Sequence, residues 1–197
     1  MSSPRIDAPP PAGFTVGVMG SGSDEHDELA RPVGELLAQL GVNLLTGGGR
    51  GVMTSVSRAF TSAPRSIGIS IGIIPCLDAA HRNIPKPGYP NPYVELPVFT
   101  HLSATGTQGW ENLSRNHINI LNSNVIIALP GGPGTASEIG LALEYGRPVM
   151  AYESDAHPAV DIPAEVRRVR SIADVASFIL QCQSGRLREV ASRSSRG

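Results

Sequence analysis

The feature that most restricts the fold of this chain is the segment from residue 124 to residue 146, which reads NVIIALPGGPGTASEIGLALEYG. Residues 125–129 form a short apolar run with β-branched members, which is typical of a buried parallel strand. The residues PGGPG interrupt this run, and apolar residues at helical spacing then predict a helix over residues 135–145 that ends at Gly146. A strand, a tight turn and a helix in this order indicate one unit of a parallel α/β sheet.

The turn in this segment has the composition of an anion-binding turn. Gly131, Gly132 and Gly134 allow positive φ angles and let backbone N–H groups come close to a ligand. The helix that follows begins with unpaired N–H donors and with the positive end of its dipole. We therefore expect a phosphate site here, and a tight turn that holds no ligand is the alternative.

Two polar residues at the start of this helix have two interpretations. Thr135 and Glu138 have the Thr-x-x-Glu spacing of a capping box, in which the glutamate accepts a hydrogen bond from the threonine N–H. The same placement puts a carboxylate beside the phosphate turn, where it is available for catalysis. The spacing alone leaves both roles open.

The rest of the chain repeats the alternation of strands and helices. Apolar runs predict strands over residues 14–18, 42–45, 66–75, 93–97, 149–152 and 166–169. Helical spacing predicts helices over residues 25–40, 52–61 and 111–122, and a final helix after residue 171. We expect an α/β fold with a three-layer, Rossmann-like, doubly wound and mainly parallel sheet in a single domain, residues 14–183. Residues 1–13 and 184–197 are expected to be flexible tails.

Two further strand-to-helix turns are rich in small residues. Gly20 and Ser21 follow the first predicted strand, and Gly47, Gly48 and Gly49 follow the second in the sequence TGGGRG. Because the loops after parallel strands all open at the carboxyl edge of the sheet, these turns are expected to share one ligand crevice with the PGGPG turn. The alternative is that the glycines serve close packing of helices on the sheet.

Long loops separate the third strand from the next predicted helix. Residues 76–92 are polar and proline-rich, and residues 99–110 contain Thr, Gly and Gln. Structureless loops of this length are uncommon in a compact domain and are often functional. The second loop is therefore a candidate for a lid or for a contact between subunits.

Composition restricts the partners of the protein. A net charge of −1 with 17% charged residues gives no broad basic surface for nucleic acid or for a membrane. No apolar stretch reaches the length of a membrane span, and the N-terminal segment lacks the apolar core of a signal peptide. Cys76 and Cys182 show no spacing typical of a metal site or a small secreted fold, so we expect a cytoplasmic protein with two free thiols.

Several common sites are excluded by their missing motifs. The histidines are His26, His81, His101, His117 and His157. None of them has HxxxH spacing or belongs to a Cys/His cluster, so no metal site is expected. The PGGPGT turn lacks the lysine of a Walker A loop, and the chain has neither the GxGxxG order of a dinucleotide site nor the GxSxG elbow of a hydrolase.

Two segments carry a resemblance to a known family. Residues 130–138, PGGPGTASE, resemble the PGGxGTxxE motif of the Lonely Guy family, long described as lysine-decarboxylase-like. Residues 46–53, TGGGRGVM, resemble that family's GGGxxGLM motif but are one residue shorter between the glycines. The phrase SRNHINILNSNVIIALPGGPGTASE is closer to a sister branch, the molybdenum-cofactor-carrier-like proteins. The resemblance covers about residues 14–178.

The resemblance implies a function and a set of site residues. Enzymes of the Lonely Guy family hydrolyse the N-glycosidic bond of nucleoside 5′-monophosphates, and the positions that match their catalytic residues are Arg115 and Glu138. The enzymes carry Arg-Lys where this chain has Arg115 and Asn116. The resemblance also implies a homodimer or a homotetramer.

Three hypotheses follow. In the first, the protein is a phosphoribohydrolase that holds the nucleotide phosphate on the N–H groups of residues 131–135, with Gly48 and Gly49 closing the other side. In the second, it is a carrier or sensor that binds the molybdenum cofactor or a nucleotide without turnover. The third is an oligomeric scaffold with empty turns. The first two share the binding of a phosphate ester.

Overall fold

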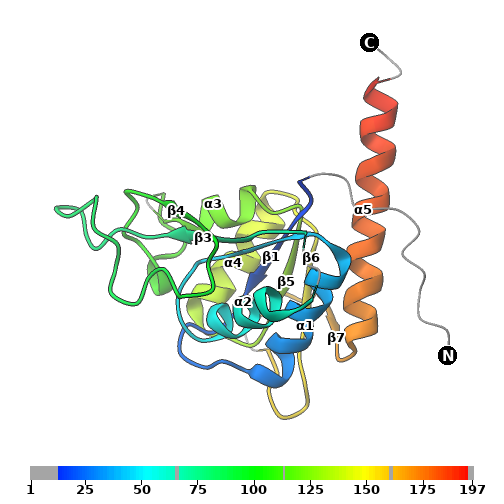
Figure 1. The fold of residues 1–197 in the computed structure, drawn as a ribbon, viewed down its shortest axis with the longest axis horizontal. Helices are drawn as coiled ribbons and strands as arrows, with labels where there is room; N and C mark the ends of the chain where they lie inside the picture. The colour runs from blue at the N-terminus through cyan, green and yellow to red at the C-terminus, as the bar shows by residue number, and fades with distance from the viewer. Residues whose placement is uncertain (1–12, 65–66, 113, 160–161, 195–197) are drawn as a thin grey trace.

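The computed structural model describes residues 13–64, 67–112, 114–159 and 162–194, and its strands form one seven-stranded sheet (Figure 1). The expected tail at residues 1–13 lies almost wholly outside the described residues. The strands are β1 (Thr15–Met19), β2 (Asn43–Thr46), β3 (Ser70–Ile74), β4 (Leu96–Phe99), β5 (Val125–Ala128), β6 (Val149–Tyr152) and β7 (Arg167–Val169).

The order of the strands creates a crevice beside the first strand. The sheet runs β4-β3-β2-β1-β5-β6-β7, and every neighbouring pair is parallel. The chain builds outward from β1 to β4 on one side and then returns to β5 on the other side of β1. At such a reversal, ligands bind in the crevice outside the carboxyl ends of the two central strands.

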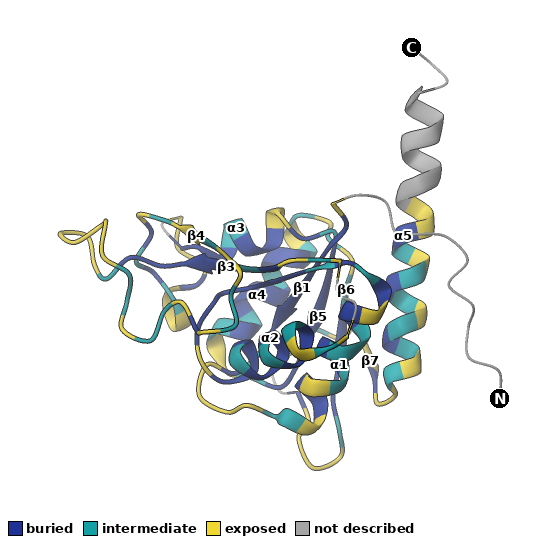
Figure 2. Ribbon diagram, in the orientation of Figure 1, coloured by how far each residue is buried: buried dark blue, intermediate teal, exposed yellow. Residues whose placement is uncertain are grey.

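Helices cover both faces of the sheet. They are α1 (Asp27–Leu40), α2 (Val52–Ser62), α3 (Asn116–Leu121), α4 (Pro133–Glu144) and α5 (Ile172–Ser194), with a short 3-10 turn, η1 (Gly106–Gln108). One core joins side chains of α1, α2 and α5 to one face of β1, β2 and β5, and smaller cores join α3 and α4 to the opposite face. Figure 2 shows the central strands buried between these layers. The predicted three-layer, doubly wound α/β fold is confirmed.

Helix α1 has the sequence properties that its position requires. Its buried residues, among them Leu29, Val33 and Leu37, recur at helical spacing and face the core. The helix ends at Gly41, whose φ of 64° is left-handed and whose N–H bonds the Ala38 carbonyl at 3.1 Å.

Helices α1 and α2 approach each other closely at Gly34. A Cβ atom at this position would lie 2.5 Å from the Val56 carbonyl oxygen and 2.8 Å from the Ala59 Cβ. Backbone atoms cannot yield as a flexible side chain does, so the contact requires glycine. The packing of these helices holds the loops after β1 and β2 in place.

The structure corrects several predicted boundaries. Strand β3 begins at Ser70 and not at residue 66, and β4 covers Leu96–Phe99 where residues 93–97 were expected. Helix α3 covers only Asn116–Leu121 of the predicted residues 111–122, since residues 104–112 form a 3-10 turn and irregular backbone. Helix α5 continues to Ser194, so the backbone is helical beyond residue 183, where the sequence analysis began a flexible tail.

We expect the substitution Gly34→Val to lower the free energy of unfolding by about 3 kcal/mol, because the added atoms overlap the α2 backbone. Urea unfolding followed by circular dichroism measures the change. The control is Gln39→Val, which places the same side chain on an exposed position of α1 and should cost about 0.5 kcal/mol. Equal losses in the two variants would contradict the account of this contact.

Candidate phosphate-binding site

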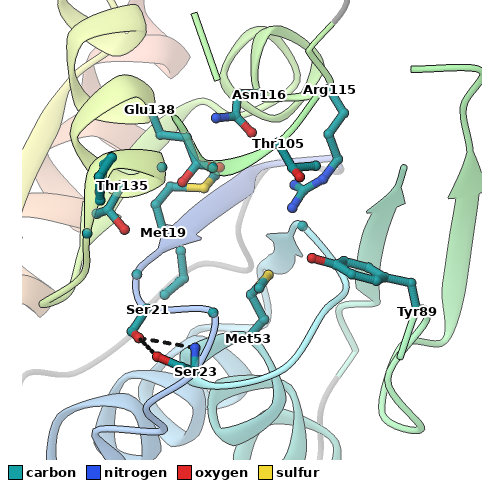
Figure 3. A pocket seen from close by; sticks show the side chains of 18 residues that line it. Met19, Ser21, Ser23, Met53, Tyr89, Thr105, Arg115, Asn116, Thr135 and Glu138 are labelled. Carbon is teal, nitrogen blue, oxygen red and sulfur yellow. Dashed lines mark hydrogen bonds between the residues drawn. The ribbon is translucent and has the colours of Figure 1, made fainter. Parts of the chain in front are cut away.

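A cavity of about 390 Å³ lies at the carboxyl ends of β1 and β5 (Figure 3). It is bounded by the loops after β1, β2 and β5, by the start of α3 and α4, and by parts of the long loops before and after β4. Eight residues predicted from the sequence line it: Gly20, Ser21, Gly47, Arg115, Gly132, Gly134, Thr135 and Glu138. The reversal in strand order therefore coincides with the cavity.

The loops after β1 and β5 touch at the floor of the cavity. The Ser21 N–H donates to the Pro130 carbonyl at 3.0 Å, and the Val52 N–H donates to the Ser21 carbonyl at 3.0 Å. A Cβ atom on Gly131 would lie 2.8 Å from the Ser21 nitrogen and would also overlap the Thr135 hydroxyl. Gly131 is therefore required for the approach of the two loops and does not itself line the cavity.

The side chain of Ser21 shapes its own loop. Its hydroxyl accepts hydrogen bonds from the N–H groups of Ser23 at 3.2 Å and Asp24 at 3.0 Å, and donates to the Asp24 carboxylate at 3.2 Å. These bonds fold the loop into a tight turn at the cavity rim (Figure 3).

The first turn of α4 offers free backbone donors to the cavity. The helix begins at Pro133, which has no N–H group, and its first carbonyl acceptor is Gly132, bonded by the Ala136 N–H at 3.1 Å. The N–H groups of Gly134 and Thr135 lie in the first turn, so they have no partner within the helix. Both residues line the cavity, where the positive end of the helix dipole favours an anion.

This start of α4 corrects two expectations. The N-cap is Gly132 and not Thr135, and Glu138 accepts its hydrogen bond from the Asn119 amide at 2.9 Å, so the predicted capping box is wrong. Gly131, Gly132 and Gly134 also do not adopt positive φ angles. The turn uses glycine for close approach and open space, not for left-handed backbone.

Arg115 supplies a buried cation that forms no ion pair with any residue that the structure describes. It precedes α3, its side chain is only 5% exposed, and its Nε and Nη1 atoms make no hydrogen bond in the structure. The guanidinium lies against Gly47, where a Cβ atom would overlap it, and 5.9 Å from the centre of the Tyr89 ring. A buried guanidinium without an anion is costly, and the charge and free N–H groups of Arg115 suit a phosphate.

Glu138 is a buried carboxyl at the same cavity. It is 7% exposed, and its Oε1 atom accepts a hydrogen bond from the Asn119 side chain at 2.9 Å. Burial raises the pKa of Glu138, and Arg115 and the Asn119 amide act in the opposite direction. The structure contains no ion pair between Glu138 and Arg115, and both side chains line the cavity (Figure 3).

Asn116 stands where the resemblance implies a lysine, and it ties two helices together. Its side-chain amide donates to the Ser137 hydroxyl at 2.9 Å, and this hydroxyl donates to the Gly134 carbonyl at 2.8 Å. Asn116 therefore holds the first turn of α4 against α3. This buried amide brings no positive charge to the cavity.

Two predicted glycines serve packing and do not line the cavity. Gly48 has a φ of 72° and faces the Ile74 side chain. The Gly49 N–H donates to the Met53 sulfur at 3.3 Å, and a Cβ atom there would lie 2.7 Å from the Tyr89 ring. The expected closing of the cavity by Gly48 and Gly49 is replaced by contacts from Gly47, Met53 and Tyr89.

Some of the lining residues that the sequence did not predict come from other segments of the chain. Among them are Met53, Tyr89, Thr105 and Gly106. Tyr89 belongs to the loop between β3 and β4, which is anchored to the glycine-rich turn because the Asn91 N–H and amide donate to the carbonyls of Gly48 at 2.8 Å and Gly49 at 2.9 Å. The length of this loop was the only signal, and it did not indicate which residue returns to the site.

Comparison with known proteins identifies the family of the chain. The model of the SLOG cluster4 family matches residues 13–191. An uncharacterized protein of Archaeoglobus fulgidus is 30% identical over 138 residues, which cover 69% of this chain and 78% of that protein.

Two solved structures are similar over nearly their full length. The molybdenum cofactor binding protein of Rippkaea orientalis is 29% identical with a TM-score of 0.63, over 85% of this chain and 96% of that chain. The molybdenum cofactor carrier protein of Chlamydomonas reinhardtii is 27% identical with a TM-score of 0.65, over 87% of this chain and 98% of that chain.

Removal of the unpaired cation should separate stability from anion binding. We expect Arg115→Leu to leave the melting temperature without phosphate no lower than that of the wild type, because a buried charge without a partner is lost. The same variant should bind inorganic phosphate about 30-fold more weakly or worse. Thermal melting with and without phosphate measures both effects.

The matched control for this variant is Arg50→Leu, which removes an exposed arginine of the glycine-rich turn that does not line the cavity. It should keep the wild-type response to phosphate. An Arg115→Leu variant that is stabilised by phosphate as much as the wild type would contradict the assignment.

The pKa of Glu138 predicts a pH dependence of stability. Burial raises the pKa of Glu138 above 4.5, so the folded state binds the proton more tightly than the unfolded state does. The protonated carboxyl therefore stabilises the fold at low pH, and this stabilisation is lost as the pH rises from 4.5 through the pKa of the folded state. Glutamine stays neutral and keeps an oxygen for the Asn119 amide. The free energy of unfolding of Glu138→Gln should therefore rise relative to the wild type between pH 4 and pH 7.

Urea unfolding at several pH values measures this difference. Glu144→Gln changes an exposed carboxylate of the same helix and serves as the control. The prediction is contradicted if the difference in the free energy of unfolding between Glu138→Gln and the wild type stays constant or falls as the pH rises. That result would show that burial does not disfavour the ionised carboxyl.

Proposed function

The chain belongs to the SLOG cluster4 family, and we propose that it binds a phosphorylated, nucleotide-like small molecule in the cavity between β1 and β5. The observation that carries the proposal is that two features suited to phosphate line one cavity. The first turn of α4 presents the N–H groups of Gly134 and Thr135, and Arg115 presents a buried guanidinium whose Nε and Nη1 atoms form no hydrogen bond with the described residues.

The two features act together on one anion. Backbone N–H groups and the helix dipole position a phosphate, and a guanidinium adds a full charge in a site largely removed from water. A dianionic phosphate ester supplies the counter-charge that the folded protein lacks. The rest of the ligand then lies against Met19, Met53 and Tyr89, which give the cavity its apolar and aromatic surface.

One candidate for the fate of the ligand is hydrolysis. The observation that favours it is the carboxyl of Glu138, which is buried beside the phosphate features and has a raised pKa. A carboxylate in this position either activates water or stabilises positive charge on a ribose as the bond to the base breaks. Water then replaces the base, and the products are the free base and ribose 5-phosphate.

The other candidate is carriage without turnover. The observations that favour it are the two solved proteins described as molybdenum cofactor binding and carrier proteins, together with Asn116 in place of a lysine. The cofactor would then be cargo, and its phosphate would occupy the same donors. In this role Glu138 closes the site and takes no proton during any reaction.

Calorimetry and product analysis with AMP distinguish these fates. The wild type should bind AMP, and Gly132→Asp should abolish binding because it places a carboxylate at the N-cap that faces the anion. Under hydrolysis, chromatography should detect adenine, and Glu138→Gln should bind AMP but release none.

Under carriage, AMP or phosphate binds in both the wild type and Glu138→Gln, and no adenine appears. Failure of the wild type to bind either AMP or inorganic phosphate would contradict the proposed function itself.

A further inference from the structure

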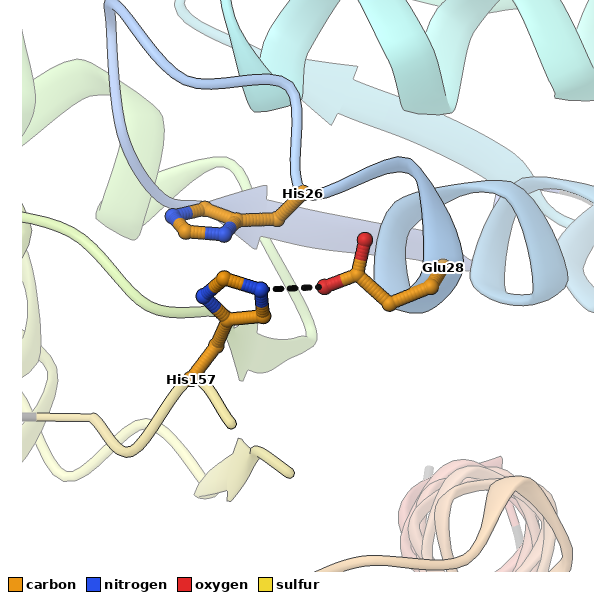
Figure 4. A group of neighbouring side chains, drawn as sticks. All are labelled: His26, Glu28 and His157. Carbon is orange, nitrogen blue, oxygen red and sulfur yellow. Dashed lines mark ion pairs between the residues drawn. The ribbon is translucent and has the colours of Figure 1, made fainter. Parts of the chain in front are cut away.

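A second group of chemically active side chains lies outside the cavity. His26, Glu28 and His157 meet at the carboxyl edge of the sheet, although they come from distant parts of the sequence (Figure 4). His26 immediately precedes α1, Glu28 lies in the first turn of α1, and His157 lies in the loop between β6 and β7. A nitrogen of each imidazole and a carboxylate oxygen all lie within 4.8 Å of one another.

The contact between His157 and Glu28 is longer than a charge-assisted hydrogen bond and has the spacing of two ligands of one metal ion. The His157 Nε2 atom is 3.4 Å from the Glu28 Oε1 atom, whereas a charge-assisted hydrogen bond closes to about 2.7–2.9 Å. Ligands about 2.0–2.1 Å from a tetrahedral ion are about 3.3 Å apart. The two imidazole rings have centres 4.9 Å apart and an edge-on arrangement.

The three side chains are available for a ligand. His26 has a φ of 40° and makes no side-chain capping bond, while its carbonyl accepts the Leu29 and Ala30 N–H groups at 2.9 Å. The chain thus starts α1 with the backbone of His26 and leaves its ring directed to His157. In the part of the chain that the structure describes, the ion pair to His157 is the only one that Glu28 makes.

The neighbouring carboxylates, in contrast, are already engaged. Asp27 accepts hydrogen bonds from the Ser55 hydroxyl at 2.6 Å and from Arg58 at 2.9 Å. Asp24 accepts hydrogen bonds from Ser21 and Ser23. The uncommitted donors are therefore two imidazoles and one carboxylate.

We propose that His26, Glu28 and His157 form a site for a divalent transition metal ion of the zinc type. Two imidazole nitrogens with one carboxylate oxygen suit zinc, cobalt or nickel, whereas magnesium and calcium prefer oxygen ligands alone. Three protein ligands leave at least one coordination position open, and the exposure of Glu28 and His157 lets water fill it.

The bound ion would join the loop after β6 to the loop after β1. The latter loop carries Ser21, which lines the phosphate cavity, and Asp24, which is bonded to Ser21. The ion would therefore restrain one wall of the cavity without contacting its phosphate features.

Calorimetry with Zn²⁺ alone tests the site on untagged, full-length protein treated with a chelator. We expect one ion per chain and a loss of affinity of about tenfold or more in His157→Ala, in Glu28→Gln and in His26→Asn. Asparagine tolerates the left-handed backbone at position 26, so this variant keeps the start of α1. The control is His81→Ala, which removes an exposed histidine paired at 2.9 Å with a single carboxylate, Asp78, and should bind zinc as the wild type does.

Cobalt absorption identifies the ligands independently of affinity. The wild type with Co²⁺ should show the d–d bands of nitrogen and oxygen ligands without a thiolate charge-transfer band, and His157→Ala should lose them. The proposal is overturned if the wild type binds no Zn²⁺, if His157→Ala and Glu28→Gln bind it unchanged, or if a thiolate band appears. Because phosphate binding does not enter this measurement, the result is separate from the proposed function.

Discussion

The structure depends on the close approach of two loops at the point where the strand order reverses. A backbone hydrogen bond from the Ser21 N–H to the Pro130 carbonyl joins the loop after β1 to the loop after β5. The two loops are so close that position 131 has no space for a side chain, which is why it must be glycine. Because β1 and β5 are neighbours in a parallel sheet, both loops leave the same edge. Their contact sets the floor of the cavity and directs the first turn of α4 across it.

The cavity is also where the fold accepts an electrostatic cost. Arg115 and Glu138 are both buried, yet they form no ion pair with each other. The Arg115 guanidinium packs against Gly47, and the Glu138 carboxyl accepts a hydrogen bond from the Asn119 amide. Removing a charge from water without pairing it destabilises a protein. A bound anion that pairs with Arg115 would offset this cost, and this is the physical basis of the proposed phosphate binding.

Local sequence patterns predicted the scaffold, and contacts distant in sequence set the details of the site. Apolar runs and glycine-rich turns indicated the parallel sheet and the cavity edge, because both are properties of adjacent residues. The predicted capping box is wrong because α4 begins earlier, at Pro133, and because the Glu138 carboxyl accepts a hydrogen bond from Asn119 of helix α3. The sequence did not predict the cluster of His26, Glu28 and His157, because His26 and His157 are far apart in the sequence and only the fold brings them together.

The most direct test of the central claim is a crystal structure of the protein grown in the presence of phosphate. The account predicts a phosphate ion within hydrogen-bond distance of the Gly134 and Thr135 N–H groups and of the Arg115 guanidinium, with Glu138 still bonded to Asn119. A cavity that contains only water while Arg115 turns to pair with Glu138 would contradict it.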